Sequence, residues 1–183
     1  EPAQPCTVKH LATHTSGLTY GIWNRDQEKL DGLGANSVLS GERAAYKDSP
    51  MMFDPGTRWA YGIGIDWLTL VIEAVSGQRI DAFCRERIFD PLNMTDTVFE
   101  RDGREDRLVG IHLRGEDGAL GPFPDVGPPP QPEVYGMGHA LLGTADDYLR
   151  FLRMFLDSGS LDGAEVLKPE TIEWMLQNHI GDL

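Results

Sequence analysis

The chain has 183 residues, enough for one domain that buries roughly 70% of the surface of its unfolded state. With 40% hydrophobic and 25% charged residues, its composition is that of a globular rather than a disordered protein. The net charge of −13 argues against nucleic acids and anionic membrane surfaces as partners, because both would repel it. No apolar run approaches the roughly 20 residues of a membrane-spanning helix.

Capped helices and turns alternate in the N-terminal half. A first helix is predicted from Thr7, a good N-cap, to about Thr15, with Gly17 as the left-handed residue that ends it. A polar, glycine-containing stretch follows over residues 18–36. A short helix is then predicted over residues 37–46. It is expected to end before Ser49-Pro50, because the residue before a proline disfavours the helical conformation.

A turn, an extended segment and a long helix come next. Pro55-Gly56 predicts the turn, and residues 58–61 are short and extended. Residues 64–76 form the clearest helix, with Gly77 as its C-terminal stop. A further helix is predicted over residues 80–89. The apolar residues at helical spacing in the long helix are Ile65, Leu68, Ile72 and Val75.

Short strands and an irregular stretch are predicted after these helices. Asn93 suits a left-handed turn, because asparagine tolerates that conformation. Short strands are expected at residues 98–99 and 109–113. Residues 120–132 are rich in proline and glycine and predict an irregular surface loop.

Two helices complete the pattern. Thr144 is a natural N-cap for a helix over residues 145–158, and Pro169 is an ideal first residue for a helix to about Asn178. We therefore predict a mainly α fold with a few short strands, without internal repeats or a domain boundary. The side chains expected to be buried by the first of these helices are Tyr148, Leu152, Phe155 and Leu156.

Neither histidines nor cysteines form a convincing motif. His10 and His14 share a helix face, as zinc ligands can, but no third ligand is adjacent, so we interpret both as structural. Cys6 stands three residues before Lys9, a spacing compatible with a reactive thiolate. We favour small apolar roles for Cys6 and Cys84. No metal and no organic cofactor is predicted.

Nucleophile motifs are also missing. The chain has no Gly-x-Ser-x-Gly, and no serine or threonine is followed three residues later by lysine. The glycine pairs Gly62-x-Gly64 and Gly136-x-Gly138 are better explained as turns than as phosphate loops.

Four segments, in the right order, together carry a specific family resemblance. They resemble the motifs of serine β-lactamase-related hydrolases, a superfamily that includes class C β-lactamases, DD-peptidases and family VIII carboxylesterases. The second segment resembles the second catalytic motif of this superfamily. The segments are Val8–Leu18, Pro55–Tyr61, Ile88–Met94 and Gly138–Asp147.

The resemblance implies a catalytic role for one tyrosine. In the superfamily, a tyrosine at the position of Tyr61 shares a proton with the lysine of a Ser-x-x-Lys motif, and together they activate the serine. Tyr61 is therefore expected to be the acid/base residue; the alternative is an aromatic core residue beside Trp59 and Trp67. The same motifs imply that Trp59, Ile63 and Gly138 bind substrate.

Residue 63 separates the branches of the superfamily. Penicillin-recognising members have asparagine there, which binds the β-lactam side-chain amide, whereas Ile63 cannot make that hydrogen bond. The segment is more similar to the carboxylesterase and statin-type acyltransferase branch. We therefore expect a small-molecule ester or amide substrate, with esters favoured. A β-lactamase or DD-peptidase is the alternative within enzymes.

The resemblance covers only the middle of the superfamily pattern. Its Ser-x-x-Lys segment normally precedes the first motif here, and its Lys-Thr-Gly or His-x-Gly strand normally follows the last helix. Residues 1–183 are thus expected to be a single partial domain, the helical portion of the serine β-lactamase-like α/β fold with the central sheet largely missing. Such a piece is expected to be inactive alone and to self-associate through exposed apolar surface. A non-catalytic binding module is the alternative from another class.

Overall fold

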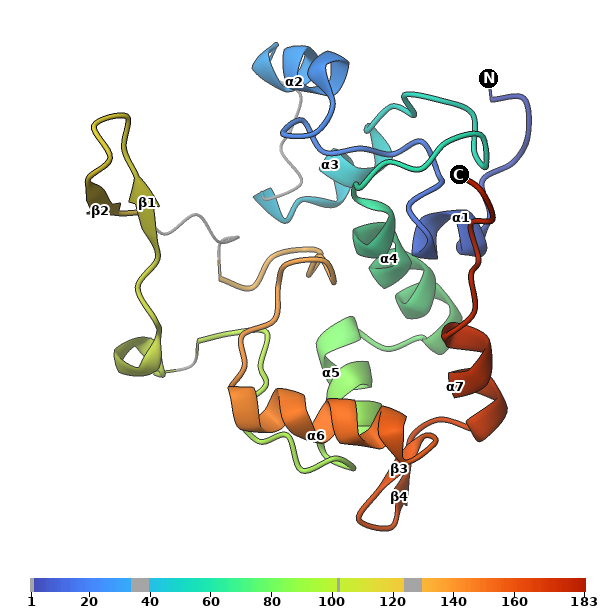
Figure 1. The fold of residues 1–183 in the computed structure, drawn as a ribbon, viewed down its shortest axis with the longest axis vertical. Helices are drawn as coiled ribbons and strands as arrows, with labels where there is room; N and C mark the ends of the chain where they lie inside the picture. Colours follow the sequence, from blue (N-terminus) through green and yellow to red (C-terminus); the bar gives the residue numbers. More distant parts are fainter. Residues whose placement is uncertain (1, 34–39, 102, 124–129) are drawn as a thin grey trace.

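The computed structural model describes residues 2–33, 40–101, 103–123 and 130–183, and most of their regular elements are helices (Figure 1). The helices are α1 (Val8–Ala12), α2 (Arg25–Gly32), α3 (Arg43–Lys47), α4 (Gly64–Ser76), α5 (Ile80–Cys84), the π-helical turn η2 (Arg85–Phe89), the 3₁₀ turn η3 (Glu105–Arg107), α6 (Ala145–Leu156) and α7 (Pro169–Met175). Two antiparallel pairs of strands join β1 (His112–Arg114) to β2 (Leu120–Pro122) and β3 (Ser160–Leu161) to β4 (Ala164–Glu165).

The start of α1 is confirmed, but its end lies earlier than predicted. The Thr7 hydroxyl accepts a hydrogen bond from the His10 N–H, and the His10 ring accepts one from the Thr7 N–H. This reciprocal cap fixes the first turn. The helix ends at Ala12, because His14 adopts φ +56° and Gly17 adopts φ +89°, both left-handed.

The predicted bounds of α4 are confirmed, including its stop. Gly77 has φ +69°, and its N–H donates to the Glu73 carbonyl. Helix α4 packs directly on α1. A β-carbon on Gly64 would lie 2.5 Å from the Leu11 carbonyl oxygen, so glycine permits this close approach. Leu11, Leu18 and Ile63 are buried in the small core between the two helices.

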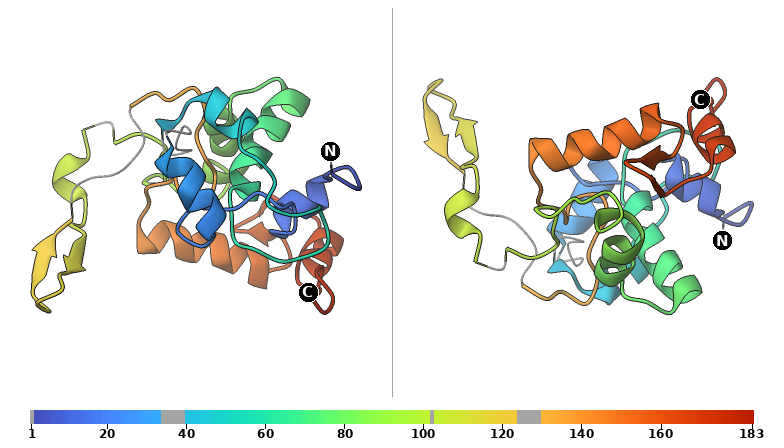
Figure 2. Two further views of the ribbon diagram at one scale, coloured as in Figure 1. Left: turned by 90° about the horizontal axis from the view of Figure 1, so that it is seen from above. Right: turned by 90° about the horizontal axis from the view of Figure 1, so that it is seen from below.

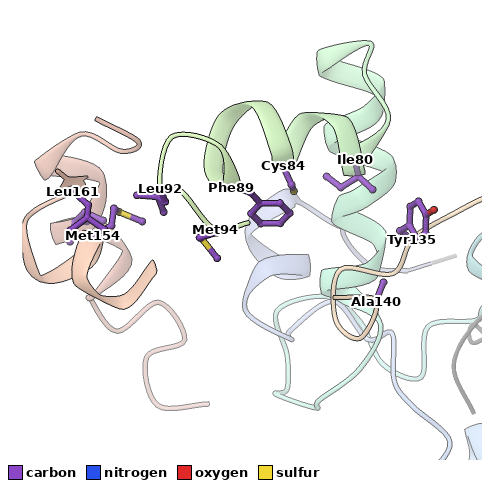
Figure 3. Close-up of a cluster of buried hydrophobic side chains, with 10 residues drawn as sticks. Ile80, Cys84, Phe89, Leu92, Met94, Tyr135, Ala140, Met154 and Leu161 are labelled. Carbon is purple, nitrogen blue, oxygen red and sulfur yellow. The ribbon is translucent and has the colours of Figure 1, made fainter. Parts of the chain in front are cut away.

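The main core gathers side chains from α5, η2, α6, β3 and α7 (Figure 3). The single helix predicted over residues 80–89 is instead a short α-helix that continues as a π-turn, after which Asn93 takes the left-handed conformation as predicted. The buried residues of this core are Ile80, Cys84, Phe89, Leu92, Met94, Tyr135, Ala140, Met154, Leu161 and Ile172.

Helix α6 begins as predicted, but it is rotated relative to the expected buried face. The Thr144 hydroxyl caps it by accepting the Asp147 N–H. Asp147 is buried, and its carboxylate accepts hydrogen bonds from the Asp96 N–H and the Thr97 hydroxyl. This anchor turns Asp147 and Met154 inward, so the prediction of burial was wrong for three residues. Those exposed are Tyr148, Leu152 and Leu156, whereas Phe155 is partly buried.

The strand predictions were correct only in part. The segment at 98–99 forms a single bridge from Val98 to Leu142, and the strand expected at 109–113 is β1, shifted toward the C-terminus. Its partner β2 lies in the stretch predicted to be irregular, of which residues 124–129 lie outside the described range. The β1–β2 hairpin extends away from the helical body (Figures 1 and 2).

Three further elements differ from the sequence prediction. Helix α2 and the β3–β4 hairpin were not predicted. Of the helix predicted over residues 37–46, the described part contains α3, which begins at Arg43, whereas residues 37–39 lie outside the described range. Helix α7 starts at Pro169 as predicted and ends at Met175. No helix in the described part of the chain combines the length and the apolar character needed to cross a bilayer.

Candidate active site

Tyr61 lies just before the first turn of α4, and backbone hydrogen bonds hold the chain on both sides of it. The Ala60 N–H donates to the His14 carbonyl at 3.0 Å, and the Gly62 N–H donates to His14 Nδ1 at 3.4 Å. The Tyr61 side chain itself is 42% exposed. The phenol is therefore fixed at its base and open to solvent, not enclosed in an apolar core.

His14 is the residue that organises this segment. Its left-handed backbone directs both the carbonyl and the ring toward residues 60–62, and its ring centroid lies 4.7 Å from that of Tyr61. Burial lowers the pKa of His14 below its ordinary value. The imidazole is thus neutral near pH 7, and because Nδ1 accepts an N–H, the proton is assigned to Nε2.

Tyr20 covers another side of the Tyr61 ring. The two ring centroids are 5.4 Å apart, and the Tyr20 hydroxyl donates to Asp66 Oδ2 at 2.6 Å. Burial, together with this hydrogen bond and the Asp66 charge, raises the pKa of Tyr20 far above its ordinary value. Tyr20 therefore stays protonated and acts as a hydrogen-bond donor.

Asp66 is completely buried in the first turn of α4. Its Oδ1 accepts the Gly138 N–H at 2.8 Å and lies 3.4 Å from His139 Nδ1, a contact that becomes an ion pair when the imidazole is protonated. The carboxylate therefore joins the turn at residues 136–140 to the start of α4. The positive end of the helix dipole at this position also favours a carboxylate.

The four residues predicted to form the site occupy different environments. Trp59 is 49% exposed and makes an edge contact with the His14 ring, so it shares the surface near Tyr61. Gly138 is exposed and is connected to that surface through the buried carboxylate of Asp66. Ile63 is only 1% exposed and points into the small core.

Sequence reasoning did not include Tyr20 or Asp66 in the site. Tyr20 follows the left-handed Gly17 closely, and Asp66 is an acidic residue between the apolar Ile65 and Trp67 in the first turn of α4. That position was a usable signal, because a carboxylate inside an apolar helix face needs donors. The identity of the donors depends on contacts across 46 and 72 residues of sequence.

The side chains considered for metal binding or nucleophilic chemistry have structural partners. The ring Nδ1 atoms of His10 and His14 each accept a backbone N–H. Within the described ranges, no group of three or more histidine, cysteine or acidic side chains could hold a metal ion. Burial raises the pKa of Cys6, and it raises that of Cys84 to about 11, which disfavours a thiolate at either position.

Comparison with known families identifies the class of protein. The family model described as Beta-lactamase matches residues 1–182, and the chain therefore belongs to the β-lactamase family. The fold is correspondingly β-lactamase-like. The structure of simvastatin synthase from Aspergillus terreus, as its LovD6 mutant, superposes with a TM-score of 0.79 at 30% identity, over 97% of this chain and 42% of that one.

Curated relatives give the same picture. Lovastatin esterase from Penicillium rubens is 35% identical, with 98% of this chain and 46% of that protein aligned. Monacolin J acid methylbutanoyltransferase from Aspergillus terreus is 28% identical, with 93% of this chain and 42% of that protein aligned. The chain thus spans less than half the length of these relatives.

Proposed function

We propose that this chain is the middle part of a serine-dependent acyl hydrolase, a carboxylesterase or acyltransferase that acts on small-molecule esters or amides. Residues 1–183 would form a single partial domain. The Ser-x-x-Lys segment, the Lys-Thr-Gly or His-x-Gly strand and most of the central sheet would belong to polypeptide outside it. The observation that carries the proposal is Tyr61, whose phenol is open to solvent while its backbone is held on both sides by His14.

The chemistry assigned to Tyr61 is proton transfer. The serine hydroxyl attacks the substrate carbonyl, its proton passes to the phenolate of Tyr61, and the phenol returns that proton to the leaving alcohol or amine. Water or a second alcohol then releases the acyl group by the same steps in reverse order. A free phenol titrates near pH 10, and the neighbouring lysine ammonium would favour the phenolate.

Residue environment supports esters over β-lactams. Ile63 offers no polar group at the position where penicillin-recognising relatives bind an amide, and its side chain is enclosed by the small core. We infer that its influence on specificity is the lack of that hydrogen bond. Trp59 and Gly138 are accessible and would contact the substrate. A relative named as an esterase and others named as acyltransferases are consistent with this choice.

The first prediction concerns Tyr61→Phe in the full-length protein. Removing the hydroxyl removes the proton acceptor, so we expect turnover of p-nitrophenyl acetate and butyrate to fall by about 10²- to 10⁴-fold. Tyr148→Phe is the matched control, because Tyr148 is an exposed tyrosine on α6. Unchanged ester turnover in Tyr61→Phe would remove the role proposed for the phenol. Nitrocefin hydrolysis faster than ester hydrolysis would favour a β-lactamase instead.

A separate labelling experiment tests residues 1–183 by themselves. Residues 1–183 are expected to show no labelling by a fluorophosphonate probe, while the full-length protein is labelled at a serine outside them. A probe adduct on any serine of the chain would contradict this division of the site. A full-length protein that reacts with neither probe nor ester would favour the non-catalytic binding module.

A further inference from the structure

The buried carboxylate of Asp66 accepts hydrogen bonds from two segments that are distant in sequence. One contains Tyr20, which lies beside the Tyr61 ring, and the other contains Gly138. We propose that Asp66 is a positioning residue: through the Tyr20 hydroxyl it sets the orientation of the Tyr61 ring, and through the Gly138 N–H it holds the turn at residues 136–140 in register with that ring. The inference rests on the proposed function in one respect, the catalytic role of the Tyr61 phenol that Asp66 would position.

Asp66 is connected to the Tyr61 ring through Tyr20. The Tyr61 ring has two aromatic neighbours, with centroid distances of 4.7 Å to His14 and 5.4 Å to Tyr20. His14 is fixed by its backbone, whereas the far end of the Tyr20 ring is held by the 2.6 Å hydrogen bond to Asp66. Without that bond, Tyr20 would gain freedom, and the Tyr61 ring would lose a wall on one side.

Asp66 is also connected to the turn at residues 136–140, whose main chain approaches its carboxylate closely. A β-carbon on Gly136 would lie 2.7 Å from Asp66 Oδ1, and one on Gly138 would lie 2.9 Å from the same oxygen. Both positions therefore need glycine if the main chain is to approach the carboxylate. The Gly138 N–H uses this approach to donate at 2.8 Å, which fixes a residue expected to contact substrate.

Burial of the Asp66 carboxylate costs free energy unless hydrogen-bond donors surround it. A carboxylate with no exposed surface loses its hydration, so hydrogen-bond donors of the protein must replace the lost water. Among the described residues, no lysine or arginine forms an ion pair with Asp66, and the nearest basic side chain is the His139 imidazole, with Nδ1 at 3.4 Å from Asp66 Oδ1. The two donors are the Tyr20 hydroxyl, whose ring borders Tyr61, and the N–H of Gly138, which is expected to contact substrate, so both hydrogen bonds lie at the candidate site.

The test uses Asp66→Asn in the full-length protein with ¹³C-labelled tyrosine. The amide NH₂ cannot accept hydrogen bonds, so one of the two donors loses its partner, and the loss of charge lets Tyr20 ionise more easily. We expect the Tyr20 signal, assigned with Tyr20→Phe, to titrate at lower pH and the Tyr61 signal to shift. We also expect kcat for p-nitrophenyl butyrate to fall by about 10- to 100-fold with KM little changed.

Asp147→Asn is the matched control. Asp147 is the other buried aspartate of the described chain, and it likewise accepts one backbone and one hydroxyl hydrogen bond. It is expected to lower the melting temperature while leaving both tyrosine signals and kcat unchanged. Equal effects of the two substitutions on kcat, or unchanged Tyr61 signals in Asp66→Asn, would overturn the proposal.

A third variant keeps the test decisive if Asp66→Asn does not fold. Tyr20→Phe retains the ring and removes only the hydroxyl that Asp66 holds. It is expected to shift the Tyr61 signal and to lower kcat by about 10-fold. The tyrosine spectra do not depend on turnover, so a full-length protein that fails the Tyr61→Phe activity test can still confirm or contradict the role of Asp66.

Discussion

At the scale of single residues, His14 shows how an unusual backbone conformation can organise a site. A left-handed φ is uncommon for residues other than glycine, although asparagine, aspartate and histidine adopt it more often than most. Here it allows one residue to bind the chain both before and after Tyr61. The neutral ring also packs against Trp59. His14 thus explains why the segment at residues 58–61 needs no strand partner to hold its tyrosine in place.

The pKa of His14 predicts a pH dependence of stability. Because burial lowers its folded-state pKa below the unfolded value of about 6.5, the unfolded chain binds the proton more readily. The contribution of neutral His14 to the free energy of unfolding is complete above the unfolded-state pKa, and it is lost as pH falls through the folded-state pKa. In urea unfolding, wild type should therefore lose stability relative to His14→Asn between pH 7.5 and 5. Asparagine also tolerates the left-handed φ.

The control for this measurement is His112→Asn, which removes an exposed imidazole from β1. A difference in unfolding free energy between wild type and His14→Asn that stays constant over the whole pH range would contradict the prediction.

The sequence placed Tyr61 between a turn and a helix start, because that is a local pattern. Its catalytic role was inferred from the family resemblance and remains a prediction. It was not sufficient for Tyr20 and Asp66, because their meaning depends on a hydrogen bond between residues 46 positions apart. Ile63 was correctly noted as an apolar residue after the tyrosine, but its burial follows from the close packing of α1 on α4. The roles proposed for Trp59, Ile63 and Gly138 remain predictions.

At the scale of elements, local caps determine where the helices begin and end. Thr7, Thr144 and Gly77 act as the sequence predicts, because each cap depends only on neighbouring backbone groups. The rotation of α6 and the π-turn after α5 depend instead on distant partners and on core packing. The spacing of apolar residues along the chain therefore could not predict the rotation of α6 or the π-turn.

Two glycines allow the energetic cost of the left-handed helix stop to be measured. Gly77→Ala forces a β-carbon into a left-handed conformation and should destabilise the protein by about 1–2 kcal/mol. Gly32→Ala, in the last turn of α2, should be neutral or stabilising by up to about 1 kcal/mol. Neither new methyl group would meet another atom of the described residues within 4 Å, so the two sites differ in backbone conformation and not in packing. Equal changes in urea unfolding midpoints would refute this explanation.

At the scale of the whole molecule, exposed apolar side chains form a continuous stripe along α6. Leu149, Leu152 and Leu156 lie at i, i+3 and i+7, and all three are exposed, Leu156 by 83%. Exposed stripes of this kind usually mark contact surfaces. We therefore expect residues 1–183 to self-associate through this stripe.

Sedimentation velocity over a range of concentrations measures this association. Leu156→Lys should shift the distribution toward monomer, because a charge at the stripe opposes burial. Val109→Lys is the control, since Val109 is 91% exposed but lies outside α6. A wild-type chain that sediments as a monomer at every concentration would exclude self-association, and equal effects of both lysines would exclude this stripe.

The β1–β2 hairpin offers a practical use of the molecule's shape. It extends from the helical body and contributes no side chain to either buried cluster of the described residues (Figures 1 and 2). Its tip, with Asp117 and the left-handed Gly118, is an exposed turn of the kind that tolerates added sequence. A fluorophore or an affinity peptide could therefore be attached there to report on the protein during turnover while the surroundings of the phenol stay intact.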